Sequence, residues 1–270
     1  GRYRPLSLAT FAVEHEFFHG NPHISHLINM LLYAFTGLLL YRTLCLMYKS
    51  PGALSPLMSL PVWATFLFLV HPVHTEVVAN IKGRDEILSL LFSLLALLTA
   101  LRYAEDRKPY RLFTGFIFVF LALLSKENAI TFIVLIPLTV YFFRSESLKD
   151  IVISAIPAIA AGLVFFLIRQ SVLGKFQVSA AGELMNNPFL HATLSQKYAT
   201  IVVTLGIYLR LLFWPHPLTI DYYPYHIALS DWMSVRVLIP LLLFCAGIVY
   251  TVATIRSKKA AAHSVLFFVI

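Results

Sequence analysis

Long apolar runs separated by short polar stretches dominate the pattern of this 270-residue chain. A helix that crosses a membrane needs about 20 predominantly apolar residues. Several runs are shorter than this, which predicts kinked or broken helices among the full spans. The predicted helices cover residues 26–47, 57–70, 74–101, 112–124, 128–143, 151–169, 198–214 and 235–255, with another from about 262. We therefore expect an all-α fold, a polytopic transmembrane helical bundle.

The polar stretches organise a single transmembrane domain over residues 1–270. We predict an external amphipathic segment at 1–25, core transmembrane helices at 26–169, and further transmembrane helices at 235–270. External loops fill 170–234 and include the helix at 198–214. The abrupt ends of the chain predict a fragment of a larger protein.

Composition supports a membrane protein and excludes other classes. Hydrophobic residues make up 59% of the chain and charged residues 13%, whereas a soluble domain carries about a quarter charged residues. The formal charge of +8 comes from Lys and Arg scattered among apolar runs, so a nucleic-acid partner is not expected. Cys45 and Cys245 stand alone in apolar runs, which predicts neither a disulfide framework nor a redox pair.

Loop charge predicts the sidedness of the bundle. Basic residues are densest in the loops at 42–56, 102–111 and 144–150, which the positive-inside rule assigns to the cytoplasm. The polar stretches at 71–86 and 125–128 then share the non-cytoplasmic face.

Two features of the second half stay open. The basic run 256–259 reaches the cytoplasm only if residues 198–214 form a membrane-surface helix rather than a span. The loop at 214–226 is rich in Trp, Tyr and Pro. It can be an interfacial loop, or it can stack on a sugar or cradle an acyl chain.

The most polar stretch, 71–86, is a candidate functional site, because ionisable residues at a membrane are costly to keep. Thr75 is a predicted N-cap of a helix running to about Leu101. Spacings of three and four place one set of side chains on a single face of that helix, which would line an outward-facing cavity. This set is Glu76, Asn80, Gly83, Arg84, Ile87 and Leu91.

Residue types in this stretch suggest roles. Arg84 suits bidentate binding of phosphate, and His74 or Glu76 can orient a hydroxyl or transfer a proton. The alternative is a structural ion-pair cluster of Arg84 with its acidic neighbours at a helix end. A divalent metal on His71, His74 and Glu76 is a further alternative, although HxxHxE is a weak signal.

Two other segments add charges to the same predicted face. Lys126 and Glu127 interrupt an apolar run, and Lys126 can neutralise a phosphate unless it is held in an internal pair with Glu127 or an Asp. The segment 11–20 is predicted to be a membrane-surface helix, and its charges, including Glu14, are expected to face solvent. Arg4 lies just before it.

Several motifs occur together in a characteristic order. They are Tyr3-Arg-Pro-Leu-Ser-Leu8, Asn21-Pro22 followed by His26-Leu-Ile-Asn29, His71-Pro-Val-His-Thr-Glu76, Gly83-Arg84-Asp85, Leu124-Ser-Lys-Glu127 and Tyr208-Leu-Arg-Leu-Leu-Phe-Trp-Pro215. The array resembles the membrane core of the GT-C superfamily transmembrane O-mannosyltransferases with tetratricopeptide repeats, in a bacterial-type form. No dinucleotide, Walker-type or serine-hydrolase motif accompanies it.

This resemblance implies a transferase that takes a mannose-like sugar from a polyprenyl-phosphate donor. The acceptor would be a hydroxyl, expected on a protein, at the non-cytoplasmic face. It implies catalytic carboxylates before Gly1 and helical repeats after the chain. The predicted catalytic residues within the chain are His74 and Glu76. The predicted donor-phosphate ligands are Arg84, Lys126 and Arg4, supported by His71, Asn80, Asp85 and Glu127.

The expected partners are the lipid-linked sugar, a protein acceptor and membrane lipid. No cofactor is certain, and a divalent metal remains an alternative. The expected location is a bacterial inner membrane in preference to an endoplasmic reticulum membrane. Two other functions are kept open: a non-catalytic scaffold that recruits partners through repeats, and a transporter or lipid-handling protein.

Overall fold

The computed structural model describes residues 3–48, 59–144, 147–174, 187–219, 222 and 226–270. The regular secondary structure of these residues is entirely helical, with no strand among them, so the predicted all-α class is confirmed. They form two compact units, Gly1–Gly174 with Phe267–Ile270, and Lys175–Leu266. We call these unit 1 and unit 2 and describe each separately. The single transmembrane domain expected from the sequence stays a prediction.

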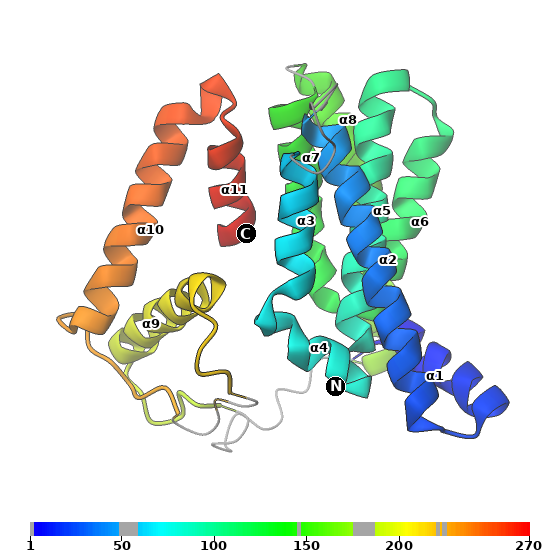
Figure 1. Ribbon diagram of the computed structural model, residues 1–270. Helices are drawn as coiled ribbons and strands as arrows, with labels where there is room; N and C mark the ends of the chain where they lie inside the picture. Colours follow the sequence, from blue (N-terminus) through cyan, green and yellow to red (C-terminus); the bar gives the residue numbers. More distant parts are fainter. Residues whose placement is uncertain (1–2, 49–58, 145–146, 175–186, 220–221, 223–225) are drawn as a thin grey trace. The chain divides into compact units, whose positions relative to one another are not determined.

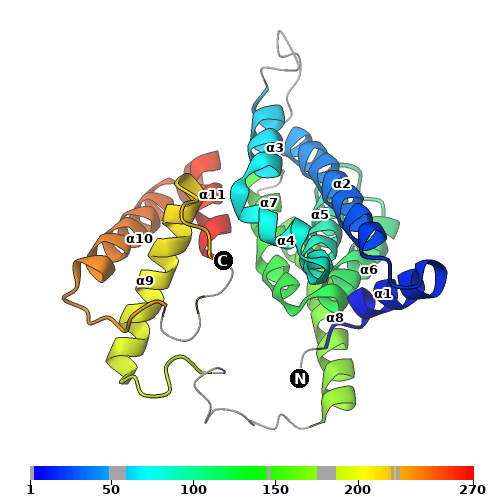
Figure 2. The same ribbon diagram turned by 60° about the horizontal axis from the view of Figure 1, so that its bottom comes forward.

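Unit 1 is a bundle of lengthwise helices with two helices across one end (Figures 1 and 2). The lengthwise helices are α2 Pro22–Tyr48, α3 Leu60–Val70, α5 Arg84–Asp106, α6 Tyr110–Ser125, α7 Phe132–Phe143 and α8 Leu148–Leu173. α1 (Pro5–Phe18) and the short α4 (Thr75–Ala79) lie at the same end of the bundle. Single 3-10 turns, η2 Pro72–His74, η3 Ile81–Gly83 and η4 Glu127–Thr131, join neighbouring helices at this end.

Four described helices are long and apolar enough to cross a membrane. These spans are Pro22–Tyr48, Ile81–Asp106, Leu148–Leu173 and Val235–Ser257. Leu60–Val70 and Pro72–Ala79 would together make a fifth span, bent by 48°. The chain is therefore a multi-pass membrane protein, as its composition predicted. The predicted runs at 112–124 and 128–143 are helical but shorter than a full span.

α5 is the most buried of the four spans and forms the centre of unit 1. It packs against α2, α6 and α7. The main apolar core includes Leu97 and Leu101 from the second half of this helix. By contrast α8 exposes Leu163 and Leu167. Apolar side chains on the outside of a bundle are expected where the solvent is lipid rather than water.

At the end of unit 1 away from α1 and α4, ion pairs join two of the basic loops that were predicted to share one side of the membrane. Arg107 pairs with Asp150, and Arg144 lies 3.2 Å from Glu105. The Asp150 carboxylate accepts hydrogen bonds from Arg107 and raises the pKa of that guanidinium above its usual value. The loops at 102–111 and 144–150 therefore share one end. Lys49, which belongs to the basic loop at 42–56 in the sidedness prediction, lies outside the described residues.

Unit 2 contains α9 (Leu194–Phe213), α10 (Val235–Thr254), the turn η5 (Ile255–Ser257) and most of α11 (Ala260–Val269). α9 begins with a capping box, in which Thr193 and Gln196 satisfy each other's backbone N–H groups. Gly206 lets α9 approach α10 closely, because a Cβ there would lie 2.3 Å from Cγ of Pro240. α9 forms where a helix was predicted at 198–214. Whether it lies on the membrane surface stays a prediction.

Candidate functional site

Five charged side chains from three segments meet at the end of unit 1 that holds α1 and α4. Arg4, before α1, pairs with Asp85 and lies 3.7 Å from Glu127. Lys126, before η4, pairs with Glu86 in the first turn of α5. We call Arg4, Asp85, Glu86, Lys126 and Glu127 the charged cluster. It brings both predicted polar stretches to one end of the bundle.

The cations of the charged cluster are less accessible than most of its carboxylates. The side chains of Arg4 and Lys126 keep only 15% and 14% of their surface exposed, compared with 37% and 41% for Glu127 and Glu86. Partial burial strengthens each electrostatic contact relative to one in bulk water. Asp85, the closest partner of Arg4, is also buried, with 8% of its side chain exposed. A negatively charged ligand that contacts Lys126 would have to displace the half-exposed Glu86.

Arg84 lies deeper and has a different set of partners. Its side chain is 1% exposed and lies 2.6 Å from Glu14 Oε2 of α1. Nε donates to Asn29 Oδ1 at 2.9 Å, and Nη2 donates to the carbonyl of Ser25 at 3.3 Å. The guanidinium also stacks over the ring of Phe11, 4.2 Å from its centre. We call Arg84 with Glu14, Ser25 and Asn29 the buried Arg84 network.

The buried Arg84 network is a structural ion pair, but its carboxylate comes from Glu14 of α1 and not from Asp85 or Glu86, the neighbours considered in the sequence. A phosphate could contact Arg84 only after the pair with Glu14 opens, because the side chain is almost completely buried. Opening would leave a carboxylate buried without its counter-charge, which is strongly unfavourable. In this conformation Arg84 joins α1, α2 and α5 rather than facing a cavity.

The predicted continuous helix from Thr75 to Leu101 is wrong, and so is its single polar face. Thr75 is the first residue of α4 and not its N-cap, and the helix ends at Ala79 before restarting at Arg84. Asn80 directs the break, since its side chain accepts from the N–H of Lys82. Asn29 of α2 then holds the turn by donating to the carbonyls of Asn80 and Ile81, each at 3.2 Å. Glu76 and Arg84 therefore belong to separate helices.

Gly83 is required by the tight turn before α5. A Cβ at this position would lie 2.1 Å from the carbonyl oxygen of Val77, a contact that the backbone cannot relieve by a side-chain rotation. We expect Gly83→Ala to lower the free energy of unfolding by about 1–3 kcal/mol through overpacking. Thermal unfolding of the purified protein in detergent measures the loss.

Gly115→Ala is the matched control, because its Cβ would meet only Thr99 Oγ1 at 3.3 Å and Pro157 at 3.7 Å. It should unfold close to the wild type. Equal stability of the Gly83 and Gly115 variants would contradict the assignment of a tight turn.

The histidines of the predicted site lie on a separate cavity of about 430 Å³ beside α2. His71 and His74 line it together with His26 and Tyr33. Tyr33 donates to the carbonyls of Phe68 and Leu69 at the end of α3. Both carbonyls lie in the last turn of α3, where they lack the helical N–H four residues ahead, so the tyrosine supplies a donor at the helix end.

Glu76 of α4 and Asn80, which follows the helix, form an exposed pair in which Asn80 donates to Glu76 at 3.2 Å. The described contacts thus divide the predicted site into the charged cluster, the histidine cavity and the buried Arg84 network. Among the described residues, no three His, Cys, Asp or Glu side chains are grouped closely enough to hold a metal ion. The HxxHxE segment therefore lacks a third ligand within the part of the chain that is described.

Glu14 is the site residue that sequence reasoning assigned wrongly. It was expected on a solvated face with its neighbours, and His15, Glu16 and His19 are indeed exposed. Glu14 is buried against Arg84. Its burial could have been inferred from its spacing from Ser7 and Phe11, which places all three residues on one helical face. For Asn29, the signal was a polar amide within an apolar run.

The chain is 28% identical to "Protein O-mannosyl-transferase F38B6.6" of Caenorhabditis elegans over 252 residues, which cover 92% of the chain and 34% of that protein. It is 36% identical to "Protein O-mannosyl-transferase TMTC4" of Homo sapiens over 145 residues, covering 48% of the chain and 19% of that protein. The named relatives are protein O-mannosyl-transferases.

The human "Protein O-mannosyl-transferase TMTC1" is 32% identical over 139 residues, or 48% of the chain and 15% of that protein. The chain thus spans about a third of the C. elegans O-mannosyl-transferase and less of the human ones. No protein-family model matches the chain, and no solved structure does. The relatives are animal proteins, so the expected bacterial inner membrane has no support.

Proposed function

We propose that the chain is part of a membrane glycosyltransferase of the transmembrane O-mannosyltransferase family, which transfers a mannose-like sugar to a hydroxyl on a protein. One observation carries this proposal: 92% of the chain aligns with a protein named as an O-mannosyl-transferase. The donor we propose is a polyprenyl-phosphate-linked sugar, because the charged cluster provides cations at the end of a lipid-facing bundle.

In the proposed reaction, the acceptor oxygen forms a bond with the anomeric carbon of the sugar. The bond between that carbon and the phosphate oxygen breaks, and the polyprenyl phosphate leaves with the bonding electrons. Lys126 and Arg4 would stabilise the negative charge that grows on this phosphate, since cations already in place need no reorganisation during the reaction. Asp85 and Glu127 would hold Arg4 in position.

Arg84 then acts as a positioning residue rather than a phosphate ligand. Its network fixes the start of α5, from which Asp85 and Glu86 reach the two cations. On the acceptor side, we assign Glu76 to orient the hydroxyl and His74 to accept the hydroxyl proton as the new bond forms. The carboxylate on α4 is exposed and already oriented by Asn80, which is the arrangement such a role needs.

The proposed site faces the non-cytoplasmic side of an endoplasmic reticulum membrane. Positive loops at 102–111 and 144–150 lie at the opposite end of unit 1 from the charged cluster, which supports this orientation. The animal relatives favour this compartment over the bacterial one.

A donor comparison with the full-length protein tests the proposal. We expect mannose to move from a polyprenyl-phosphate mannose to an acceptor peptide, and not from a nucleotide mannose, in vesicles that contain the purified protein. Radiolabel on the peptide is the measurement. Vesicles without the protein are the control, and transfer from the nucleotide sugar alone would contradict the assigned donor.

The paired charges of the cluster also fit a non-catalytic scaffold, because each cation already has a carboxylate partner in the fold. The same assay separates the two functions. A folded protein that transfers sugar from neither donor to any peptide or membrane protein acceptor would favour the scaffold.

A further inference from the structure

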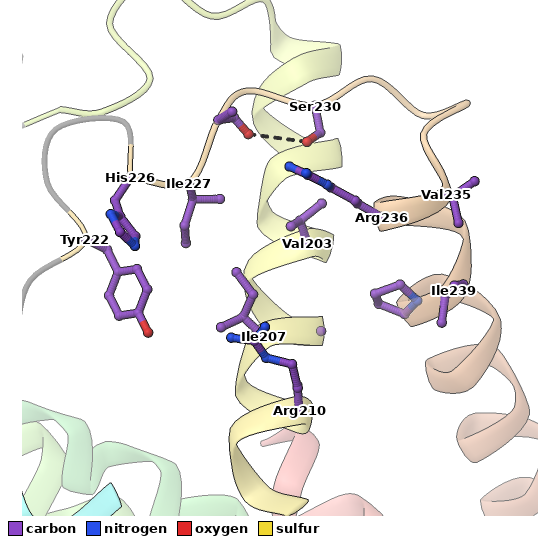
Figure 3. Close-up of a pocket in the computed structure, with 13 residues that line it drawn as sticks. Val203, Ile207, Arg210, Tyr222, His226, Ile227, Ser230, Val235, Arg236 and Ile239 are labelled. Carbon is purple, nitrogen blue, oxygen red and sulfur yellow. Dashed lines mark hydrogen bonds between the residues drawn. The ribbon is translucent and has the colours of Figure 1, made fainter. Parts of the chain in front are cut away.

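Unit 2 contains a cavity of about 500 Å³ that the proposed transferase reaction does not use. It lies between α9 and α10 and is covered by the segment around residues 226–230 (Figure 3). Arg210 enters its lining from α9, and Arg236 from the first turn of α10. Two arginines thus reach one cavity from different helices.

The polar lining of the cavity favours an anion. Tyr222 and His226 complete it, with ring centres 5.4 Å apart. No Asp or Glu of the described residues is part of the lining, and neither arginine makes an ion pair with a described carboxylate. This differs from the charged cluster of unit 1, where each cation already faces a carboxylate. Guanidinium groups bind phosphate by paired N–H donors, which makes phosphate the best-matched anion.

The remaining walls of the cavity are apolar. Val203 and Ile207 line the cavity from α9, and Ile239 lines it from α10 (Figure 3). Pro240 of α10 is also part of the lining. A free anion gains nothing from these surfaces, whereas an anion attached to a hydrocarbon chain can bury that chain against them. The lining therefore suits an amphipathic ligand with one phosphate.

The location of Arg236 indicates where that ligand comes from. It lies in the first turn of α10, a candidate membrane span whose most apolar stretch is almost entirely exposed. Trp232 and Trp214 are exposed nearby in sequence, and tryptophan is enriched at the level of lipid headgroups. A basic residue at the end of a span lies at the depth of lipid phosphates.

The cavity is held open by contacts of its own. The N–H of Ser230 donates to Thr200 Oγ1 at 3.0 Å, which ties the covering segment to α9. Ile227 packs against Val203 and Val237 in a small apolar core. These contacts are made by the protein itself, which lowers the entropic cost of ordering the site on binding.

We propose that this cavity binds the phosphate of a membrane lipid through Arg210 and Arg236, with the lipid chain lying along α10. The ligand is a phosphate on an apolar chain, carried by either a glycerophospholipid or a polyprenol. This binding does not depend on transferase activity, so it can be correct even if the proposed function is wrong.

Lipid titrations followed by native mass spectrometry of the full-length protein test the proposal. The probes are phosphatidic acid, a diacylglycerol with the same acyl chains, and a short polyprenyl phosphate. We expect phosphatidic acid or the polyprenyl phosphate to bind at least tenfold more tightly than diacylglycerol, and the tighter of the two identifies the source. Arg210→Gln with Arg236→Gln should weaken that binding by tenfold or more, the loss expected for charged hydrogen bonds.

Arg256→Gln is the matched control, because it removes an exposed arginine of the same unit that does not line the cavity. It should bind lipid within about twofold of the wild type. The single Arg210 and Arg236 variants replace the double variant if the latter unfolds. Equal loss in the Arg256 variant, equal binding of diacylglycerol, or displacement of lipid by equimolar inorganic phosphate would each overturn the proposal.

Discussion

Replacing Arg84 by glutamine is expected to lower the free energy of unfolding by about 3–5 kcal/mol. The substitution leaves Glu14 buried without its counter-charge and removes the donors to Asn29 and Ser25. The expected result is a lower unfolding temperature and a reduced yield of folded protein in nanodiscs. Tryptophan fluorescence during heating measures the change.

Two further variants make this result specific. Arg102→Gln removes an exposed arginine from the same helix and should change stability by less than about 0.5 kcal/mol. Glu14→Gln combined with Arg84→Gln should recover part of the loss, because no unpaired charge then remains inside. If Arg84→Gln were as stable as Arg102→Gln, the buried network would carry no stability and Arg84 would again be available to a ligand.

Replacing Lys126 by alanine in the full-length protein is expected to reduce kcat for sugar transfer by about 10²–10³-fold. The reason is the loss of a fixed cation beside the departing phosphate. Stability should change little, because a partly exposed ion pair contributes only about 0–1 kcal/mol, and Glu86 keeps 41% of its side chain exposed. Steady-state transfer to a peptide at saturating donor measures the effect.

Lys82→Ala is the matched control, since Lys82 is exposed in the turn before α5 and carries the same charge. Its kcat should stay within about twofold of the wild type. Exchanging the charges in Lys126→Glu with Glu86→Lys restores the ion pair and tests a purely structural role. Normal transfer by the exchanged protein, or by Lys126→Ala, would remove Lys126 from the mechanism.

The long spans were predictable because a span depends on its own sequence. Uninterrupted apolar runs at 151–169 and 235–255 correspond to α8 and α10 within a few residues. Backbone groups in lipid must be satisfied within the helix, so no distant partner decides the outcome. The shared location of the polar stretches was also predictable, because alternating spans place alternate loops at one end.

The break between α4 and α5 was not predictable in the same way. It depends on Asn29, which precedes Asn80 by 51 residues and supports the turn through its amide. Periodicity alone favoured one continuous helix through these positions. The close approach of Gly83 to Val77 was equally hidden, although an Asn followed by Gly three residues later is a usable warning.

The carboxylate partners of the cations could not be predicted from the sequence. Arg84, Lys126 and Arg4 were predicted as phosphate ligands, with ion pairs to neighbouring acidic residues as the alternative for Arg84 and Lys126, whereas the structure pairs them with Glu14, Glu86 and Asp85. Which carboxylate meets which cation depends on how three segments pack, and spacing within one segment carries no such information. The sequence analysis did not predict that Arg210 and Arg236 line one cavity, because they lie on α9 and α10, which a loop separates.

The charge balance at the end of unit 1 that holds the charged cluster affects the selectivity for a phosphate ligand. It holds one more carboxylate than cations: Arg4, Arg84 and Lys126 against Glu14, Asp85, Glu86 and Glu127. An incoming phosphate must therefore replace an anion that is already bound, and this exchange yields little net Coulomb energy. Discrimination between a lipid-linked sugar and small cellular anions must then come from contacts with the sugar and the hydrocarbon tail.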